Sequence, residues 1–321
     1  LHELANKVGV ELSYKSSKVN NAIYEVNNFA SDLFFKNLLN FKPHIDYLKN
    51  NRNFNDDTIS HFKMGSTANF STIQKKLLSE FELKELIVAG IFNKNQNSKL
   101  FFMNRIMVPI INLQNRVLGF GARVIDQSLP KYINTSETKV FKKKQILFNE
   151  KILDKHTNKK LILVEGYFDV IKLHQSGIQN CIAPLGTAIN YERLIELTKK
   201  GFEIIVCLDG DTAGRNASIR LMNNLLSSEN FELGIKFVLL PKNYDPDLLL
   251  DSNLKEQLNK LLDNPLNIEQ LIEKYLEKYN YSQNIDEKFK GSKILKNLLS
   301  TVANKDLKKI LNDYFSEIKK S

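Results

Sequence analysis

The sequence of 321 residues contains no tryptophan and only two cysteines. Cys181 and Cys207 stand apart in the apolar segments NCIAPLG and IIVCLDG, and neither belongs to a Cys-x-x-Cys pair. This spacing argues against a structural zinc site and predicts two buried, reduced thiols. The five histidines are scattered without a His-x-x-x-His pair, so we interpret them as surface or packing residues.

Long apolar runs are also missing. No run approaches the ~20 residues that a membrane helix needs, and the first residues, LHELANKVGV, do not have the pattern of a secretory signal. We therefore expect no membrane association and a cytoplasmic location. The sequence does not begin with methionine, which predicts that it is a piece of a longer protein.

The positive charge is concentrated in one part of the chain. The net charge is +10, and residues 99–160 hold thirteen Lys and Arg against four Asp and Glu, a net of +9. Residues 161–250 hold eight against eleven, a net of −3. A basic block beside an acidic one favours a polyanionic partner, most simply nucleic acid, over a solvated lysine-rich surface.

The residue patterns predict two kinds of structure before residue 130. Residues 1–98 have apolar residues at helical spacing, interrupted at Pro43, and predict a mainly helical region. The segment RIMVPIINLQNRVLGFGARVI, at 105–125, predicts a β-hairpin. Its GFGAR predicts a bulge or turn and not a phosphate loop, because no helix follows it directly.

Strands and helices alternate from residue 161 onward. The apolar runs LILVEG, CIAPLG, EIIVCLDGD and IKFVLLP are separated by helical segments, two of which stop at Gly177 and Gly201. Such alternation predicts an α/β domain with a mostly parallel four-stranded sheet flanked by helices. Residues from about 265 to 321 are again helical, and Pro265 suits a helix start.

Acidic residues follow three of these four predicted strands. Glu165 follows the first, Asp209 and Asp211 the third, and Asp245 and Asp247 the fourth. Because parallel strands end at one edge of a sheet, we expect the five carboxylates to lie together. Two such charges ~4 Å apart repel by about 4 kcal/mol at an effective dielectric of 20, which a bound Mg²⁺ or Mn²⁺ would offset.

Asp169 is a less certain member of this acidic set. It lies four residues after Glu165, so both side chains could face one side of the first helix turn. An alternative role for Asp169 is a hydrogen bond to the backbone or to a neighbouring basic side chain. Two divalent ions held by the set could clamp the attacking and leaving oxygens of a phosphoryl transfer.

These segments resemble a known family. The stretch LVEGYFDVIKLHQSGIQNCIAPLGTAI, followed by CLDGDTAGRNA and DPD, resembles the Toprim domain of bacterial DnaG-type primases, and RIMVPI, VLGFGARV and KYINTSET…FKKK resemble their basic subdomain. The resemblance implies a basic α/β subdomain at 1–142, a Toprim domain at 143–264 and a small helical subdomain at 265–321. It also implies a nucleotidyltransferase that makes short RNA primers from NTPs on single-stranded DNA.

The resemblance implies roles for individual residues. Six acidic positions match the family's metal-binding set: Glu165, Asp169, Asp209, Asp211, Asp245 and Asp247. Three of them, Glu165, Asp209 and Asp211, also match catalytic positions. The positions that match its nucleotide- and template-binding residues are Arg105, Arg123, Lys131 and Lys143. Two departures concern phosphate contacts: Lys144 stands where the family usually has Gly, and Gln145 where it often has Arg.

The same resemblance implies cofactors and partners. We expect two or more Mg²⁺ or Mn²⁺ ions, no zinc in this fragment and a monomeric core. The family's zinc-binding module and helicase-binding domain have no counterpart in this sequence, so contact with a replicative helicase is expected only in the full-length protein.

Two alternatives remain open. A Toprim nuclease or a topoisomerase fragment would share the acidic set, although no segment resembles the tyrosine-bearing domain of a topoisomerase. A DNA-binding module with a decayed metal site would bind DNA without catalysis, and the intact acidic set argues against it. A fused helicase is excluded for this chain because no Gly-x₄-Gly-Lys-Ser/Thr motif occurs.

Overall fold

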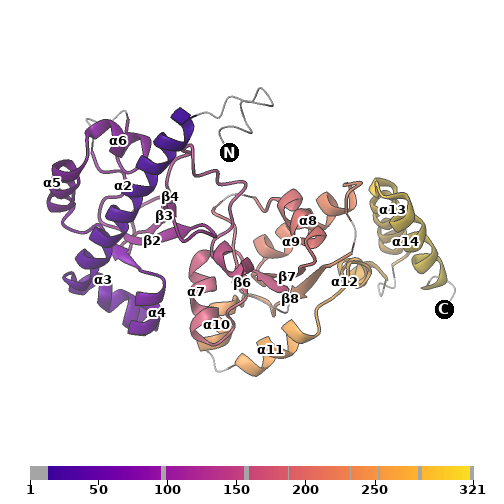
Figure 1. Cartoon of the computed structure of the whole chain (residues 1–321). Helices are drawn as coiled ribbons and strands as arrows, with labels where there is room; N and C mark the ends of the chain where they lie inside the picture. Colours follow the sequence, from indigo (N-terminus) through magenta and orange to yellow (C-terminus); the bar gives the residue numbers. More distant parts are fainter. Residues whose placement is uncertain are drawn as a thin grey trace, which may run out of the picture. The chain divides into compact units, whose positions relative to one another are not determined.

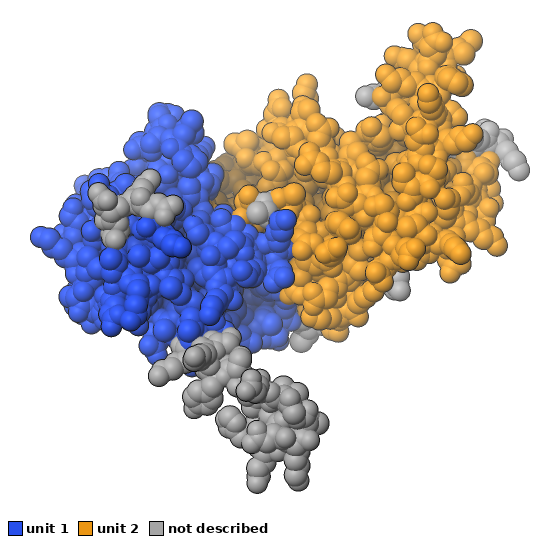
Figure 2. All heavy atoms as spheres, turned by 90° about the horizontal axis from the view of Figure 1, so that it is seen from above, with its two compact units in different colours: residues 1–154 blue, residues 155–321 orange. Residues whose placement is uncertain are grey.

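The chain folds into two compact units, residues 1–154 and residues 155–321 (Figure 2). The computed structural model describes residues 14–94, 99–154, 159–186, 188–231, 233–251, 254–280 and 284–318. The first 13 residues, part of the predicted helical region, lie outside the described residues. The predicted three-part division at 142/143 and 264/265 stays a prediction.

The first half of unit 1 is helical, as predicted (Figure 1). Its helices are α2 (Tyr14–Leu39), α3 (Lys42–Asp46), the π-helical turn η1 (Tyr47–Asn51), α4 (Asp56–His61), α5 (Phe70–Glu80) and α6 (Leu83–Val88). Pro43 lies in the first turn of α3, where its missing N–H has no helical partner to lose. The expected interruption at Pro43 is therefore the boundary between α2 and α3.

A four-stranded antiparallel sheet follows, with the order β1-β2-β3-β4. The strands are β1 (Gly65–Ser66), β2 (Ile106–Ile111), β3 (Val117–Arg123) and β4 (Tyr132–Asn134). The predicted hairpin is confirmed as β2 and β3. The bulge predicted at GFGAR lies at its start: Ile110 pairs with Gly119 and Ile111 with Val117, so the register shifts at Leu118, and the rest of GFGAR pairs regularly inside β3.

The glycine at position 119 is explained by packing and not by a turn. A Cβ there would lie 2.9 Å from the Thr135 hydroxyl, which accepts a hydrogen bond from the Phe120 N–H at 2.8 Å. The close approach of Thr135 to β3 therefore requires a residue without a side chain.

Helix α2 packs across the sheet and is tied to it by a buried amide. Asn27 is 0% exposed, and its Nδ2 donates to the carbonyls of Val117 at 3.2 Å and Leu118 at 3.0 Å. The apolar residues of α2, including Ile23 and Phe34, join Phe120 and Ala122 of β3 in one core cluster. The amide thus satisfies carbonyls that would otherwise be buried without partners.

Unit 2 contains the parallel sheet that the alternating pattern predicted. Its strands are β5 (Lys160–Leu163), β6 (Cys181–Ile182), β7 (Glu203–Leu208) and β8 (Ile235–Leu239), in the order β6-β5-β7-β8, and all three pairs are parallel. Cys181 and Cys207 are buried free thiols in β6 and β7, also as predicted, and burial raises the pKa of both.

Helices cover both faces of this sheet (Figure 1). Helices α8 (Tyr191–Lys199) and α9 (Thr212–Leu226) contact each other and β7, while α7 (Tyr167–Gln175) packs against α10 (Pro246–Asp251), which is followed by α11 (Lys255–Asp263). The arrangement follows from right-handed crossovers between parallel strands. The predicted stops at Gly177 and Gly201 are confirmed, since both glycines have positive φ.

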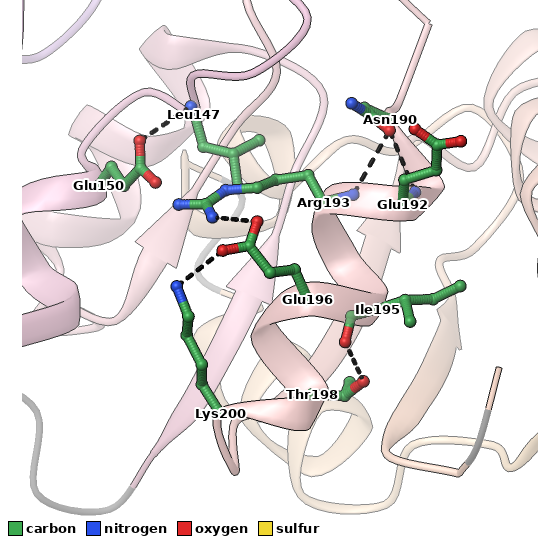
Figure 3. Close-up of polar contacts among 9 residues, drawn as sticks. All are labelled: Leu147, Glu150, Asn190, Glu192, Arg193, Ile195, Glu196, Thr198 and Lys200. Carbon is green, nitrogen blue, oxygen red and sulfur yellow. Dashed lines mark hydrogen bonds and ion pairs between the residues drawn. The ribbon is translucent and has the colours of Figure 1, made fainter. Parts of the chain in front are cut away.

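Helix α8 shows how local polar contacts fix one of these covering helices (Figure 3). The Asn190 side chain accepts hydrogen bonds from the N–H groups of Glu192 and Arg193, which caps the helix. Glu196 pairs with Arg193 at 2.6 Å and with Lys200 at 2.7 Å. Hydrogen bonds from Lys200 and Arg193 lower the pKa of Glu196.

After α11 the chain continues with α12 (Ile268–Asn280), α13 (Ile285–Thr301) and α14 (Lys305–Ile318). The expected helix start at Pro265 is wrong, because Leu266 pairs with Phe237 of β8 through two backbone hydrogen bonds of 2.8 and 2.7 Å, and α12 begins only at Ile268. Helix α13 contacts α9.

In the described ranges, no helix is long and apolar enough to cross a membrane.

We predict that Asn27→Ala destabilises the chain by about 1–3 kcal/mol, because two buried carbonyls lose their donor. Urea denaturation of the whole chain measures the change. Asn21→Ala is the matched control, since Asn21 is exposed on the same helix and alanine is the better helix former. Equal stability of the two variants would contradict the structural role assigned to Asn27.

Candidate active site

Four of the five carboxylates predicted to lie together, those of Glu165, Asp209, Asp211 and Asp245, act on one another at the carboxyl edge of the parallel sheet, while Asp247 acts on Asp169. Asp209 follows directly on β7, and its N–H donates to Oε1 of Glu165, which follows β5, at 3.1 Å. Asp211 caps α9, and Asp245 precedes α10. The charges of Asp211 and Asp245 both act on Glu165 and on Asp209. Asp247 lies in the first turn of α10.

The loops after β7 and β8 are fastened to each other through glycine. The Gly210 N–H donates to the Tyr244 carbonyl at 2.7 Å, and the Gly210 carbonyl accepts from the Asn243 N–H at 3.3 Å. A Cβ at position 210 would lie 1.9 Å from the Pro241 carbonyl oxygen, so no other residue fits without moving backbone. The approach brings the Asp209–Asp211 loop to the loop that carries Asp245.

Arg215, in the first turns of α9, adds two contacts across the same junction. Its Nε donates to the Gly210 carbonyl at 3.4 Å, and its Nη2 donates to the Leu240 carbonyl at 3.1 Å. Arg215 therefore holds the loop after β7 and the loop after β8 together. No role was predicted for Arg215 from the sequence, although the residue stands in the stretch CLDGDTAGRNA.

Two of the acidic residues cap helices with one oxygen each. Oδ1 of Asp211 accepts from the Gly214 N–H at 2.8 Å, and Oδ1 of Asp245 accepts from the Leu248 N–H at 2.6 Å. These bonds fix the direction of both side chains at the starts of α9 and α10. Each carboxylate keeps a second oxygen with lone pairs for a further interaction.

Gly214 allows the acidic loop to close tightly over Glu165. A Cβ at this position would lie 2.3 Å from the Asp209 carbonyl oxygen and 2.7 Å from Oε1 of Glu165. The glycine thus lets the first turn of α9 approach both residues.

Burial and mutual repulsion make the centre of this cluster resist ionisation. Burial, followed by the charges of Glu165, Asp245 and Asp211, raises the pKa of Asp209 to about 7. Burial likewise raises the pKa of Glu165, and the hydrogen bond from the Asp209 N–H opposes that shift. An added cation would favour the ionised form of both groups.

The wall beside Glu165 is largely apolar. A cavity of about 160 Å³ is lined there by Pro184, Leu208, Ala217 and Leu221, with Arg220 and Asn224 also on its surface. Apolar neighbours withhold hydration from the Glu165 carboxylate, which is the physical origin of its raised pKa.

Asp169 belongs to the same electrostatic cluster but serves a different purpose. The helix begins at Tyr167, so Glu165 precedes it, and the prediction that both acids share the first helix turn is wrong. Oδ2 of Asp169 accepts from the Gly166 N–H at 2.9 Å, which is the backbone role that the sequence left as the alternative. Complete burial raises the pKa of Asp169 to about 8.

A buried lysine reaches the edge of the cluster, and the sequence analysis did not single it out. Nζ of Lys172 on α7 lies 3.3 Å from Oδ1 of Asp247 and 2.6 Å from Oδ1 of Asp251. The spacing of Asp247 and Asp251 by four residues on α10 is the signal that could have predicted a shared basic partner.

The chemistry of this donor set fits a hard divalent cation. Oδ1 of Asp209 is buried and has no hydrogen-bond partner among the described residues. Carboxylate oxygens with a shared negative charge are the ligands that Mg²⁺ and Mn²⁺ prefer. However, no three described His, Cys, Asp or Glu side chains converge on one point as a preformed metal centre.

Two of the basic residues predicted to bind phosphate are buried in unit 1. Arg105 is 8% exposed, and its Nη1 donates to the Pro130 carbonyl at 3.0 Å. Arg123 is 5% exposed, and its guanidinium lies over the rings of Tyr132 at 4.8 Å and Tyr47 at 5.6 Å. Both arginines thus hold β4 and its preceding loop in place.

The two predicted lysines are more accessible. Lys131 is exposed directly before β4, and its carbonyl accepts from the Val124 N–H at 3.1 Å. Lys143 is half-buried, and its N–H donates to Oε1 of Glu137 at 2.9 Å. Lys131 and the arginine pair come together through the β3–β4 connection, while Lys143 lies further along the chain.

Two family models match the chain. Residues 34–153 match the DNA primase catalytic core, N-terminal domain, and residues 159–235 match the Toprim domain. The two matched ranges fall on either side of the boundary between the two compact units.

Relatives named DNA primase are similar over most of the chain. The protein of Rickettsia prowazekii is 35% identical over 325 aligned positions, which cover 98% of this chain and 54% of the relative. That of Deinococcus radiodurans is 35% identical over 282 positions, which cover 82% of this chain and 47% of the relative. The chain thus spans about half the length of the curated relatives it matches.

Solved structures show the same fold. The zinc-binding and RNA polymerase domains of the Aquifex aeolicus primase match with a TM-score of 0.79 and 27% identity, over 99% of this chain and 77% of that one. A DnaG primase catalytic domain bound to single-stranded DNA matches with a TM-score of 0.76 and 25% identity, over 94% of this chain and 96% of that one.

The raised pKa values predict that stability falls with increasing pH. Folded Asp209 and Asp169 keep their protons up to about pH 7 and 8, while unfolded aspartate loses its proton near 3.8. The folded state therefore binds more protons than the unfolded state between these pH values. For each extra proton bound, the unfolding free energy falls by about 1.4 kcal/mol as the pH rises by one unit. Stability is highest at the acidic side of this window and is lost toward pH 8.

We predict that Asp169→Asn flattens this decline, because the amide oxygen can still accept from Gly166 and carries no proton to lose. Thermal melting between about pH 6 and pH 9, without divalent cations, measures the slope. Asp313→Asn, at an exposed position of α14, is the control and should retain the full slope. A variant at position 169 with the unchanged slope would show that this carboxyl is ionised throughout.

Proposed function

Because the chain carries the catalytic-core N-terminal domain and the Toprim domain of the DnaG-type primases, we propose that it is the RNA polymerase core of a DNA primase. It would synthesise short RNA primers from NTPs on a single-stranded DNA template during replication. The relatives and neighbouring structures named primase support this reaction as the first hypothesis.

One observation carries the proposal most directly. Glu165, Asp209, Asp211 and Asp245 gather at one sheet edge, where Asp209 has a buried oxygen without a hydrogen-bond partner in the described part of the chain. Crowded carboxylates repel one another in the free chain, so a bound cation would stabilise their ionised form and could in turn hold phosphate oxygens.

We assign the central role to the residues on the two strand ends. Glu165, Asp209 and Asp211 would be the catalytic carboxylates, and with Asp245 and Asp247 they would hold two or more Mg²⁺ or Mn²⁺ ions. When bound, these ions supply Lewis-acid activation of the primer 3′-hydroxyl and charge stabilisation for the leaving pyrophosphate. Asp169 would support the set from within α7.

The protein's own groups would orient the reaction. Gly210 allows close contact with Pro241, and Gly214 allows close contact with Asp209 and Glu165. These contacts would hold the Asp209–Asp211 loop beside Glu165, so the reacting oxygens would meet preorganised carboxylates. Lys131 and Lys143 would bind nucleotide or template phosphates by charge, as would other lysines of residues 99–160. Arg105 and Arg123 would contribute by shaping the β3–β4 connection and the field around it.

The partners of the longer protein follow from the same proposal. We infer that a zinc-binding module and a helicase-binding domain would accompany this core, and that the core itself would act as a cytoplasmic monomer containing no zinc.

A primer-synthesis assay tests the proposal. The chain is mixed with single-stranded DNA, four NTPs and Mg²⁺ or Mn²⁺, and both labelled RNA and the template are resolved on one gel. We predict short RNA from the unaltered chain and a loss of about 100-fold or more in Asp209→Asn/Asp211→Asn, because the developing charge loses its stabilising ligands. Asp313→Asn should retain full activity.

The other outcomes separate the competing functions. Full activity of the double variant would contradict the assignment of the carboxylates. Degraded template without RNA would indicate a nuclease. Intact template without RNA would be followed by a pre-annealed RNA primer, whose extension would assign the missing step to initiation.

A further inference from the structure

Lys172 is a buried cation that stands between two carboxylates of a neighbouring helix. Its side chain is 6% exposed, and Nζ lies 2.6 Å from Oδ1 of Asp251 and 3.3 Å from Oδ1 of Asp247. An ammonium group removed from water is strongly destabilising unless it is paired. The two aspartates are therefore counter-ions that this lysine requires.

The two aspartates differ in position and in accessibility. Four residues separate them, so they share one face of α10, which packs against α7. The Asp247 side chain is 13% exposed and belongs to the proposed cation set, whereas that of Asp251 is 38% exposed and lies at the end of α10. The shorter distance is the one to Asp251. The ammonium is thus already close to a carboxylate outside the proposed cation set.

We propose that Lys172 is an exchangeable counter-ion, which neutralises Asp247 while no divalent cation is bound and pairs with Asp251 alone when one binds. The inference rests on the proposed function, since it takes Asp247 as a cation ligand. An ammonium and a divalent ion beside one carboxylate repel each other, so each weakens the binding of the other. Lys172 would therefore set how tightly the free chain holds its cations.

The exchange predicts opposite effects for two substitutions. Lys172→Met keeps the length of the buried stem and removes the competing charge, so Mn²⁺ should bind on the order of tenfold more tightly. Asp251→Asn removes the second carboxylate, so the ammonium depends more on Asp247 and Mn²⁺ should bind on the order of tenfold more weakly. If Lys172 only holds α7 against α10, both substitutions would lower stability and the Mn²⁺ affinity would not change in opposite directions.

The experiment is a Mn²⁺ titration of the whole chain, without DNA or nucleotides, followed by the electron paramagnetic resonance signal of free Mn²⁺. Thermal melting with and without Mn²⁺ is recorded in parallel. Lys172→Met should melt lower than the unaltered chain without the ion and recover more of its stability when the ion is added. Lys172→Arg, which keeps the charge, is the matched control and should titrate like the unaltered chain.

Several results would overturn the inference. These are equal Mn²⁺ affinity in the unaltered chain and in Lys172→Met, changes of the same sign in both variants, or no Mn²⁺ binding at all. If Lys172→Met does not fold, Lys172→Gln takes its place, because the amide can still donate to Asp247 without a charge. The titration measures binding alone, so its failure is distinguishable from a failure of RNA synthesis.

Discussion

The close approach of Gly210 to the carbonyl of Pro241 is the constraint on which the acidic site depends. It joins the loop after β7 to the loop after β8, and the backbone hydrogen bonds of Gly210 with Tyr244 and Asn243 maintain the junction. Arg215 donates across the same junction to two carbonyls. Without this contact the carboxylates of separate strands would repel each other apart, since several like charges share one small volume.

The repulsion that remains is balanced in different ways at different positions. Asp211 and Asp245 each direct one oxygen to a helix N-terminus, where the N–H groups favour negative charge. Asp247 has a lysine beside it. Burial raises the pKa values of Asp209 and Asp169, and the negative charges around them raise these values further. The site is thus held together by backbone geometry and is electrostatically strained at its centre.

The parts of this arrangement that follow from chain order were predictable. Apolar runs alternating with helices indicate parallel strands, and the residues after each run, such as Glu165 and Asp209, must then share an edge. Contacts made by side chains from remote segments were not predictable. The pairing of Lys172 with Asp251 joins residues 79 positions apart, and the stacking of Arg123 on Tyr47 depends on how η1 packs near β3. GFGAR shows the same limit: its first glycine, Gly119, allows the close approach of Thr135, which no local pattern indicates.

The burial of Arg105 and Arg123 has a consequence for how ionic strength would act on this protein. Counterions condensed on a nucleic acid are released by cations that reach its phosphates, and the number released sets the slope of affinity against salt concentration. Arginine residues that are 8% and 5% exposed, with guanidinium groups engaged with a carbonyl or with aromatic rings, would release few of them. For a complex of nucleic acid with unit 1, the slope of affinity against salt concentration would therefore depend on the exposed lysines. The two arginines would contribute little to it.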